Sequence, residues 1–342
     1  MSQCRIAVVI PAYNAAGLLP EVVEAAMRAA GDARVLVVDA GSTDGSGRVA
    51  EQLGAEVVRL PRREGPARAR NIGVTHVDAD VVLFLDSDCV ARPDVVERVR
   101  TAFESDPELV ALCGSYDDAP RDPGFFSQYM NLRHHYTHHR ANREEATFWA
   151  GCGAVRRDAF LAIGGFDAKR FPRPQIEDIE LGYRLRRHGR TRLDPALQVT
   201  HLKRWTLRGT VYTDIAQRGV PWSRLLLEHG DLPDDLNLRL GQRVAAALAP
   251  FALVAIPAAA AATIAGRPVL ALAALALLGL SLALQLDFVR ELTRLRGAGF
   301  AARAWLFHQV HLTYSAATYA LCWLGHRVGQ RRSAAPHPRS SA

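Results

Sequence analysis

Short apolar runs alternate with helical patterns over the first 200 residues or so, and this alternation limits the fold more than any other feature of the chain. The runs have the composition of buried strands and lie at 5–10, 34–39, 55–60, 81–86 and 109–114. Helical spacing occurs between them, at 18–30, 45–53, 66–76 and 93–104. We therefore predict an α/β domain whose mostly parallel sheet is flanked by helices.

The composition changes after residue 243. The runs 244–266 and 269–286 contain no charged residue, and only Arg267 and Pro268 separate them. A helix needs about 20 apolar residues to cross the hydrocarbon layer, so we predict a transmembrane helical hairpin with spans at about 244–266 and 269–286. Two buried core helices are the alternative, but no other part of the chain is large enough to surround both.

A third apolar stretch, 305–325, is interrupted by His308, Gln309 and His311. The four arginines of 287–304 favour a cytoplasmic return before it, and the arginines after it would lie outside if it crossed the membrane. We therefore prefer an interfacial or re-entrant helix, with a third span as the alternative. The expected division is a cytoplasmic domain at 1–240, a multi-pass cell-membrane domain at 241–330 and a disordered basic tail at 331–342.

The charge pattern argues against a nucleic-acid partner. The net charge of +7 comes mainly from arginines, which are scattered among acidic residues without a basic stripe or interleaved aromatics. Phosphate-bearing small molecules and anionic lipid headgroups stay compatible with this charge. The five cysteines form no CxxC pair, and the N-terminus lacks the long apolar core of a secretory signal, so we expect reduced thiols and a cytoplasmic N-terminal domain.

Two carboxylates, Asp86 and Asp88, emerge at the end of the strand predicted at 81–86, with Ser87 between them. Carboxylates at this spacing can approach one hard divalent cation. Such a cation, Mg²⁺ or Mn²⁺, bridges the oxygens of a diphosphate and neutralises the charge on a departing phosphate. A DxD triplet by itself often marks a solvated turn, but the hydrophobic strand before it and the motifs around it favour a metal site.

Six segments, taken in order and spacing, resemble family 2 glycosyltransferases. They are VVIPAYN (8–14), VVDAGSTDGS (37–46), GPARARNIG (65–73), FLDSDC (84–89), GGFD (164–167) and IEDIELGYRL (176–185). The resemblance covers roughly residues 5–210. It implies a GT-A fold and an inverting, membrane-attached enzyme that takes its sugar from a nucleotide-sugar donor.

The resemblance also implies which residues hold the donor nucleotide. These are Pro11, Ala12, Tyr13, Asp39, Arg70, Asn71, Asp86 and Ser87. Asp39 is expected to accept hydrogen bonds from the base, and Asp86 and Asp88 to hold the cation on the diphosphate. Asp44 is either a weaker contributor or a cap for the helix at 45–53.

A second acidic pair, Glu177 and Asp178, opens the helical pattern after residue 176. The helix dipole in the first turn favours the ionised form of Asp178. An ionised carboxylate near the anomeric carbon takes the proton of an acceptor hydroxyl as the sugar is displaced with inversion. By resemblance Asp178 is the general base and Glu177 the second choice, with helix capping as the alternative role of the pair.

Two further segments are expected beside the donor. Trp149 offers a stacking face, and Gly151 and Cys152 would contact the donor sugar or the acceptor, although a tight turn explains the glycines equally well.

The segment 201–205 resembles, imperfectly, the QxxRW segment of processive family members, with His201 in the place of glutamine. His201 could complete the metal site, and Arg204 and Trp205 would lie at the diphosphate. The departure from QxxRW favours a single transfer over polymer synthesis. Four nearby histidines, 134, 135, 138 and 139, are expected on a solvated helix face rather than at a metal, with contact to an acceptor or to lipid headgroups as the alternative.

The leading hypothesis is metal-dependent transfer of a sugar to a hydroxyl of a lipid or lipid-linked acceptor. The family resemblance alone favours a UDP-sugar as the donor. A polyprenyl-phosphate glycosyltransferase, a short polysaccharide synthase and a membrane scaffold with a vestigial nucleotide pocket are the alternatives. A phosphate acceptor needs no strong base, so the Glu177–Asp178 pair favours a hydroxyl. A nucleotidyltransferase and a Rossmann oxidoreductase are disfavoured, because no phosphate-binding glycine loop follows the first strand.

Overall fold

The computed structural model describes residues 3–144, 147–230 and 239–333. The chain divides into two compact units, Met1–Leu207 and Arg208–Ala342. This division lies earlier than the boundary predicted near residue 240, because the segment after residue 207 packs within the second unit. For example, the Tyr314 hydroxyl donates a hydrogen bond to Asp214 Oδ2 at 2.7 Å.

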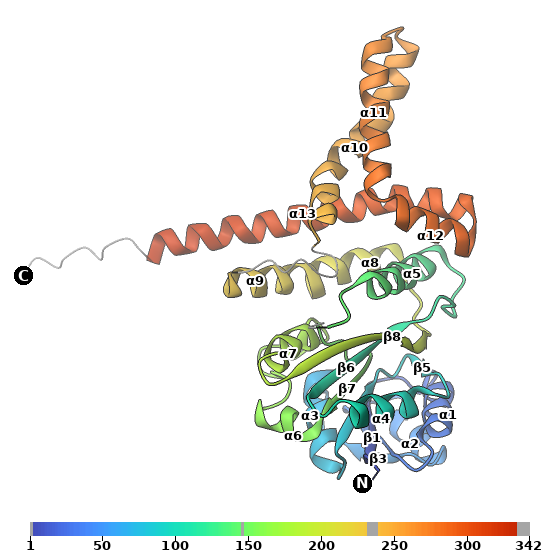
Figure 1. Cartoon of the computed structure of the whole chain (residues 1–342), viewed down its shortest axis with the longest axis vertical. Coiled ribbons are helices and arrows are strands. Elements are labelled where there is room, and N and C mark those ends of the chain that lie inside the picture. Colours follow the sequence, from blue (N-terminus) through green and yellow to red (C-terminus); the bar gives the residue numbers. More distant parts are fainter. Residues whose placement is uncertain (1–2, 145–146, 231–238, 334–342) are drawn as a thin grey trace, which may run out of the picture. The chain divides into compact units, whose positions relative to one another are not determined.

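An eight-stranded sheet forms the centre of the first unit (Figure 1). Its strands are β1 (Ile6–Ala12), β2 (Arg34–Asp39), β3 (Glu56–Arg59), β4 (Val81–Leu85), β5 (Cys89–Ala91), β6 (Leu109–Tyr116), β7 (Cys152–Arg156) and β8 (Arg190–His201). In space they follow the order β3-β2-β1-β4-β7-β6-β8-β5.

The sheet is mixed rather than mostly parallel. Strands β1 to β4 pair in parallel with one another, and β6 pairs in parallel with β8. In contrast, β7 runs antiparallel between β4 and β6, and β5 runs antiparallel to β8. Because β7 runs antiparallel to β4, the residues just before β7 lie next to the carboxyl end of β4.

All five predicted strands are confirmed, as β1 to β4 and β6, and β1, β4 and β6 are buried at every position. The four predicted helices are also present, as α1 (Leu19–Ala30), α2 (Ser46–Gln52), α3 (Pro66–His76) and α4 (Val95–Ser105). Three further helices complete the first unit: α5 (Phe125–Arg140), α6 (Arg157–Ala162) and α7 (Glu177–Leu185).

Helix α3 approaches the sheet closely because Gly73 has no side chain. A Cβ atom at Gly73 would lie 2.4 Å from Val9 Cγ1 on β1, a distance that only glycine permits. Arg70 lies three residues earlier, on the same face of α3. The close packing therefore holds Arg70 against the sheet.

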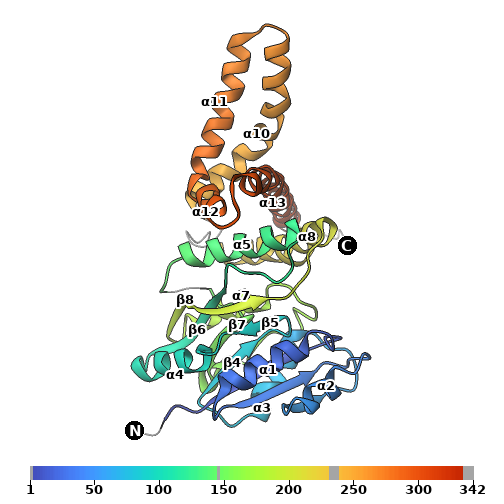
Figure 2. The same cartoon turned by 90° about the vertical axis from the view of Figure 1, so that its right-hand side faces the viewer.

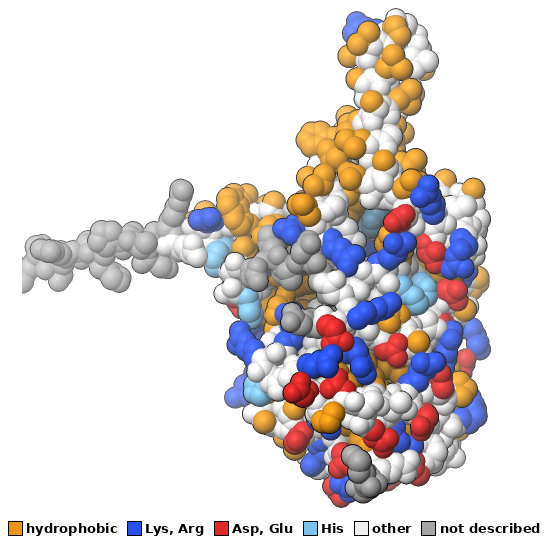
Figure 3. Space-filling model, viewed as in Figure 1, with side chains coloured by type: hydrophobic (Ala, Val, Ile, Leu, Met, Phe, Trp, Pro, Cys, Tyr) orange, Lys and Arg blue, Asp and Glu red, His pale blue; other side chains and the backbone are white. Residues whose placement is uncertain are grey.

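The second unit is helical. It contains α8 (Leu207–Tyr212), which begins at the boundary, the π-helix η1 (Thr213–Gly219), α9 (Val220–His229), α10 (Leu240–Ile264), α11 (Pro268–Leu284), α12 (Leu286–Arg296) and α13 (Ala298–Ser333). Helices α10 and α11 lie side by side as a hairpin, with Ala255, Ala259 and Ala274 packed between them (Figure 2). Hydrophobic side chains gather on the outside of this pair (Figure 3), and the large exposed ones include Phe251, Val254, Ile264, Leu270, Leu272 and Leu275.

Among the described helices, α10 is the one that is long and apolar enough to cross a membrane by itself. Helices α11 and α12 meet the same criteria together, but they are bent by 72° at their junction. The composition of α13, which contains the stretch 305–325, does not qualify it as a span. The described helices thus include one candidate span, or two if the bent pair counts as one.

A buried polar cluster lies at the bend between α11 and α12. Gln309 of α13 accepts a hydrogen bond from Ser281 Oγ at 3.0 Å and donates one to Gln285 Oε1 at 2.9 Å. This cluster attaches α13 to the bend. Helix α13 continues to Ser333, so residues 331–333 are helical rather than part of a disordered tail, and 334–342 lie outside the described residues.

Candidate active site

The predicted site residues come together because the carboxyl ends of β1, β2 and β4 meet at one edge of the sheet. Ala12 and Asp39 are partners in the register of β1 and β2, and Asp86 directly follows β4. His201, the last residue of β8, pairs with Cys89 of β5. This pairing brings His201 beside Asp88, more than a hundred residues away in sequence.

Hydrogen bonds join the loops that follow β1 and β2, where a nucleoside is expected. Asp39 is buried, and its Oδ1 accepts a hydrogen bond from the Ser42 amide at 2.9 Å. Asn14 Oδ1 accepts one from the Thr43 amide at 2.9 Å, and Asn14 adopts a left-handed φ of 49°. Asparagine tolerates this conformation better than most residues, so Asn14 links the two loops, a role that was not predicted from the sequence.

The other predicted nucleoside residues lie in or next to β1. Pro11 and Ala12 are buried within the strand. The ring of Tyr13 is partly exposed, and the Arg63 guanidinium lies 4.6 Å from its centroid. Asp44 accepts hydrogen bonds from the amides of Ala16 and Ser46 at 2.9 and 3.0 Å, so its carboxylate holds the turn before α2.

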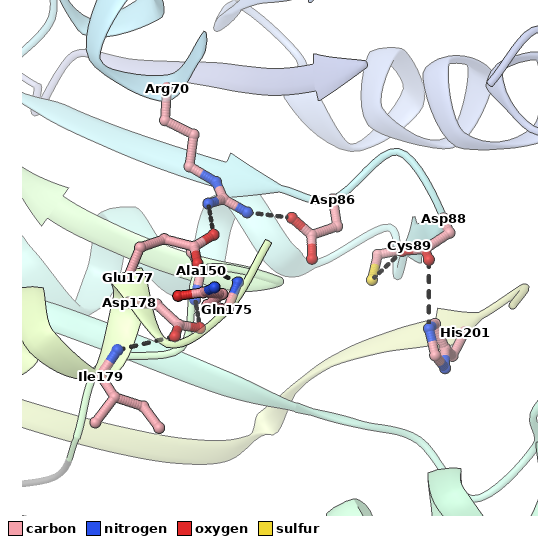
Figure 4. A network of polar contacts seen from close by, with 10 residues as sticks. All are labelled: Arg70, Asp86, Asp88, Cys89, Ala150, Gln175, Glu177, Asp178, Ile179 and His201. Carbon is pink, nitrogen blue, oxygen red and sulfur yellow. Dashed lines mark hydrogen bonds and ion pairs between the residues drawn. The ribbon is translucent and has the colours of Figure 1, made fainter. Parts of the chain in front are cut away.

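Arg70 forms the centre of a buried ionic network (Figure 4). Its Nη2 donates to Asp86 Oδ1 at 2.6 Å, and its Nη1 donates to Glu177 Oε1 at 3.1 Å. Only 4% of the Arg70 side chain and 6% of the Glu177 side chain are exposed. Burial by itself would lower the pKa of Arg70, but the two carboxylates raise it, so the guanidinium stays charged.

Asn71, predicted to contact the nucleotide, uses both of its polar groups within the protein. Its Nδ2 donates to the Phe166 carbonyl at 2.8 Å, and its Oδ1 accepts from the Phe166 amide at 2.9 Å. Asn71 therefore holds the GGFD segment against α3, and its contact with a nucleotide stays a prediction.

Asp178 lies at the start of α7, half-buried beside Glu177. Its Oδ2 accepts a hydrogen bond from the Ala150 amide at 3.3 Å and its Oδ1 accepts one from the Ile179 amide at 2.8 Å. Burial, followed by the charge of Glu177, raises the pKa of Asp178 to about 7. This direction is opposite to the effect expected from the helix dipole, because burial and a neighbouring like charge outweigh it.

Asp88 and His201 lie next to each other on the other side of Asp86 (Figure 4), and His201 Nε2 lies 3.5 Å from Asp88 Oδ2. Burial would raise the pKa of Asp88, but the hydrogen bond and charge of His201 lower it to about 2. The ring of His201 stacks on Tyr116, with 4.3 Å between centroids. Asp88 is therefore an ionised carboxylate beside an oriented imidazole.

The donor atoms at this position fit a divalent cation. Asp86, Asp88 and Cys89 each offer an atom that lies within 4.8 Å of the others. Burial raises the pKa of the Cys89 thiol well above its usual value, so the thiol is neutral and a poor ligand. The carboxylates of Asp86 and Asp88, with the imidazole of His201, form the set that suits Mg²⁺ or Mn²⁺, and Ser87 lies in the turn between the carboxylates.

The segment before β7 lies against Asp86. Gly151 O accepts a hydrogen bond from the Asp86 amide at 3.2 Å. A Cβ atom at Gly151 would lie 2.4 Å from Cζ2 of Trp149, so the indole explains the glycine. The Cys152 side chain lies in the hydrophobic core. Cys152 as a whole is fully buried, and its expected contact with the donor sugar or the acceptor stays a prediction.

The two predicted diphosphate residues differ in exposure. Trp205 is buried, and its amide donates to Ser127 Oγ at 2.8 Å. The side chain of Arg204 is 83% exposed, and its Nε lies 3.8 Å from Asp122 Oδ2. Arg204 is thus free to reorient toward an anionic ligand, whereas Trp205 is fixed.

The histidines of α5 pack against aromatic residues of the site instead of forming a solvated face. His135 Nδ1 forms a hydrogen bond with the Tyr116 carbonyl at 2.8 Å, and the ring of His138 lies 5.2 Å from that of Trp149. Tyr116 contacts both Trp149 and His201, and the sequence analysis missed it. Tyr116 is the last residue of β6. The expectation that site residues lie at strand ends, which singled out Asp39 and Asp86, applies to Tyr116 as well.

Comparisons with known proteins agree with this arrangement. Residues 7–164 match the model of Glycosyl transferase family 2. A pre-mycofactocin glycosyltransferase of Mycobacterium tuberculosis (strain CDC 1551 / Oshkosh) is 30% identical over 215 residues, which are 59% of this chain and 44% of that protein. An undecaprenyl-phosphate 4-deoxy-4-formamido-L-arabinose transferase of Enterobacter sp. (strain 638) is 35% identical over 116 residues, covering 31% and 36% of the two chains.

A mannosyltransferase from Pyrobaculum calidifontis, solved in complex with GDP-Man and Mn²⁺, has a similar fold. The TM-score is 0.58 with 22% identity, and the match covers 94% of this chain and 88% of that one. This likeness shows the fold alone. The chain spans about half the length of the curated relatives it matches.

The mixed sheet with its flanking helices is a GT-A type fold. Within the chain, residues 7–164 form a domain of glycosyl transferase family 2.

Proposed function

We propose that the chain transfers a sugar from a nucleotide-sugar donor to a hydroxyl of a lipid or lipid-linked acceptor at the cytoplasmic face of the membrane, in single transfers with inversion. One observation carries the proposal: two carboxylate sites lie at one sheet edge and share Arg70. Asp86 and Asp88, beside His201, suit a diphosphate-bound cation. Asp178 has the raised pKa of a group that exchanges protons near neutrality.

The donor, which we propose to be a UDP-sugar, lies with its nucleoside over the loops after β1 and β2. Pro11, Ala12 and Tyr13 border the base and ribose, and Asp39 accepts a hydrogen bond from the base. Arg70 and Asn71 act on the donor indirectly. Arg70 orients Asp86, and Asn71 holds the GGFD segment.

In the proposed reaction, Asp178 takes the proton of the acceptor hydroxyl. The acceptor oxygen bonds to the anomeric carbon on the face opposite the diphosphate, and the bond from that carbon to the diphosphate oxygen breaks. The diphosphate leaves with the electron pair, so the configuration inverts. Asp86, Asp88 and His201 would hold a divalent cation, which would supply positive charge for the leaving diphosphate. The exposed guanidinium of Arg204 offers a second positive charge.

The acceptor is the least constrained part of the proposal. The Enterobacter relative is named for undecaprenyl phosphate, which makes a polyprenyl phosphate the second candidate acceptor. That acceptor is already anionic and needs no base, whereas this chain places Asp178 and Glu177 at the site. A hydroxyl acceptor therefore fits the site better.

A panel of donors and acceptors tests the proposed function. Detergent-solubilised full chain is incubated with UDP-, GDP- and dTDP-sugars, with a bacterial glycolipid extract or undecaprenyl phosphate, and with Mn²⁺, Mg²⁺ or chelator. We expect release of nucleoside diphosphate from one UDP-sugar, dependent on metal and on the glycolipid extract. Release with undecaprenyl phosphate alone would favour the second candidate, and lack of any metal-dependent donor binding would refute both.

We further propose that α10 and α11 insert in the cell membrane as a hairpin, with the first unit in the cytoplasm. The exposed apolar side chains of this pair support insertion. Arg290, Arg294 and Arg296, which follow the hairpin on α12, support a cytoplasmic return.

We expect the full chain to stay in the membrane pellet after carbonate extraction and to shift into the soluble fraction when Leu272, Leu275 and Leu280 are all changed to arginine. Release of the wild-type chain by carbonate would contradict insertion.

A further inference from the structure

Arg70 connects two acidic sites that are distant in sequence. Asp86 lies 16 residues away at the end of β4, and Glu177 lies 107 residues away at the start of α7. One guanidinium donates to both, through different nitrogens. Its third nitrogen, Nε, is buried and has no hydrogen-bond partner among the described residues. The fork of Arg70 is therefore the direct link between the proposed cation site and the proposed base.

The charges around this link do not balance. The charged groups that act on Asp178 are Glu177, adjacent on α7, and Arg70 of α3. Arg70 in turn faces three carboxylates, those of Asp86, Glu177 and Asp178. A single guanidinium cannot compensate all three in a buried site. The share of its positive charge that each carboxylate receives depends on what else binds to the others.

We propose that Arg70 is a positioning residue that couples occupancy of the cation site to the acidic pair on α7. The inference rests on the proposed function, because it takes Asp86 as a cation ligand. With the cation site empty, Arg70 is divided between Asp86 and Glu177. A cation on Asp86 competes with Arg70 for that carboxylate, which leaves the guanidinium to Glu177 and Asp178. The acidic pair thus gains positive compensation only once the cation is bound.

Coupling of this kind is reciprocal. If a cation on Asp86 strengthens the contact between Arg70 and Glu177, then Glu177 must favour the cation by drawing Arg70 away from Asp86. Removing the charge of Glu177 leaves Arg70 with Asp86 as its main partner, and the cation must then displace a stronger contact. Glu177 is buried beside Arg70, not beside the cation ligands, so this effect has to pass through the guanidinium.

A double-mutant cycle on Mn²⁺ affinity tests the coupling. Mn²⁺ alone is titrated into the detergent-solubilised full chain, and free Mn²⁺ is followed by electron paramagnetic resonance. We expect Glu177→Gln to weaken Mn²⁺ binding by about fivefold or more in the wild-type background. In an Arg70→Lys background we expect the same change to weaken binding less than about twofold, because an ammonium lacks the fork that reaches two carboxylates.

Glu180→Gln is the matched control. Glu180 lies on the same helix in an ion pair with another arginine, Arg184, at 2.7 Å, so we expect no change in Mn²⁺ affinity. Equal weakening by Glu177→Gln in both backgrounds would overturn the coupling. If Arg70→Lys does not fold, the two single variants decide. Equal Mn²⁺ affinities of Glu177→Gln and Glu180→Gln would also overturn the coupling. Mn²⁺ binding that survives Asp88→Ala would instead refute the cation site itself.

Discussion

The Asp178→Asn variant is expected to lose about 10²- to 10⁴-fold in the rate of sugar transfer while binding the donor as well as the wild type does. Asparagine has the size of aspartate and keeps one side-chain oxygen, which can accept the amide hydrogen bond of Ile179. It gives up the longer bond from Ala150, because that amide donates to the other oxygen of Asp178. It cannot take a proton from an acceptor hydroxyl. Comparing kcat with the dissociation constant for UDP separates these two effects.

Glu177→Gln distinguishes the two candidates for the base. If Asp178 is the base, this variant keeps transfer within reach of the wild type at saturating cation. A loss of about 100-fold or more from Glu177→Gln, with Asp178→Asn close to the wild-type rate, would make Glu177 the base and contradict the assignment.

The pH dependence of kcat/KM also tests whether Asp178 is the base. A base must be ionised to act, so transfer rises with pH through the pKa of Asp178 and levels off above it. Because burial and Glu177 raise that pKa to about 7, the acidic limb lies near neutrality rather than in the usual range of aspartate. Removing the Glu177 charge lowers the pKa of Asp178, so Glu177→Gln moves the limb to lower pH. A limb that moves upward would contradict this electrostatic account.

The Asp88→Ala variant is expected to lose about 100-fold or more of the metal-dependent transfer rate. Asp88 is ionised and lies beside His201, so its removal takes away one of two carboxylate ligands. Chelation of the wild type has the same expected result, and added Mn²⁺ restores the wild type but not the variant.

Asp94→Ala provides the control for Asp88→Ala. Asp94 lies six residues later, half exposed in a surface pair with Arg98, and we expect its replacement to leave the rate unchanged. Full activity of Asp88→Ala, or of the wild type in chelator, would contradict a cation role for this site.

Local pattern predicted β1 to β4, β6 and the helices α1 to α4, but it missed β7 and β8 for identifiable reasons. Strand β8 carries Pro195 after Asp194, which is typical of a turn, and its burial alternates along its length instead of forming an apolar run. Strand β7 is short and contains Gly153. The boundary near residue 240 was predicted from the change in composition, but η1 and α9 belong to the second unit although their composition is mixed.

The candidate site was predictable where it follows strand ends, as at Asp39, Asp86 and Asp88. His201 was expected beside Asp88 from the resemblance, and it lies 3.5 Å away. The other partners of these residues were not predictable, because they depend on contacts between distant segments. Arg70 could be singled out as a donor of hydrogen bonds, but its division between Asp86 and Glu177 follows only from the packing of α3 and α7. The direction of the Asp178 pKa shift was mispredicted for a similar reason, since the sequence shows the helix start but not the burial.

Anomalous diffraction at the manganese edge, from crystals of the full chain grown with UDP and Mn²⁺, locates the cation directly. We expect a peak in contact with Asp86, Asp88 and His201, with the diphosphate of UDP bound to the same ion. UDP bound at the sheet edge with no manganese peak at these residues, or a peak among the histidines of α5, would contradict the proposed cation site.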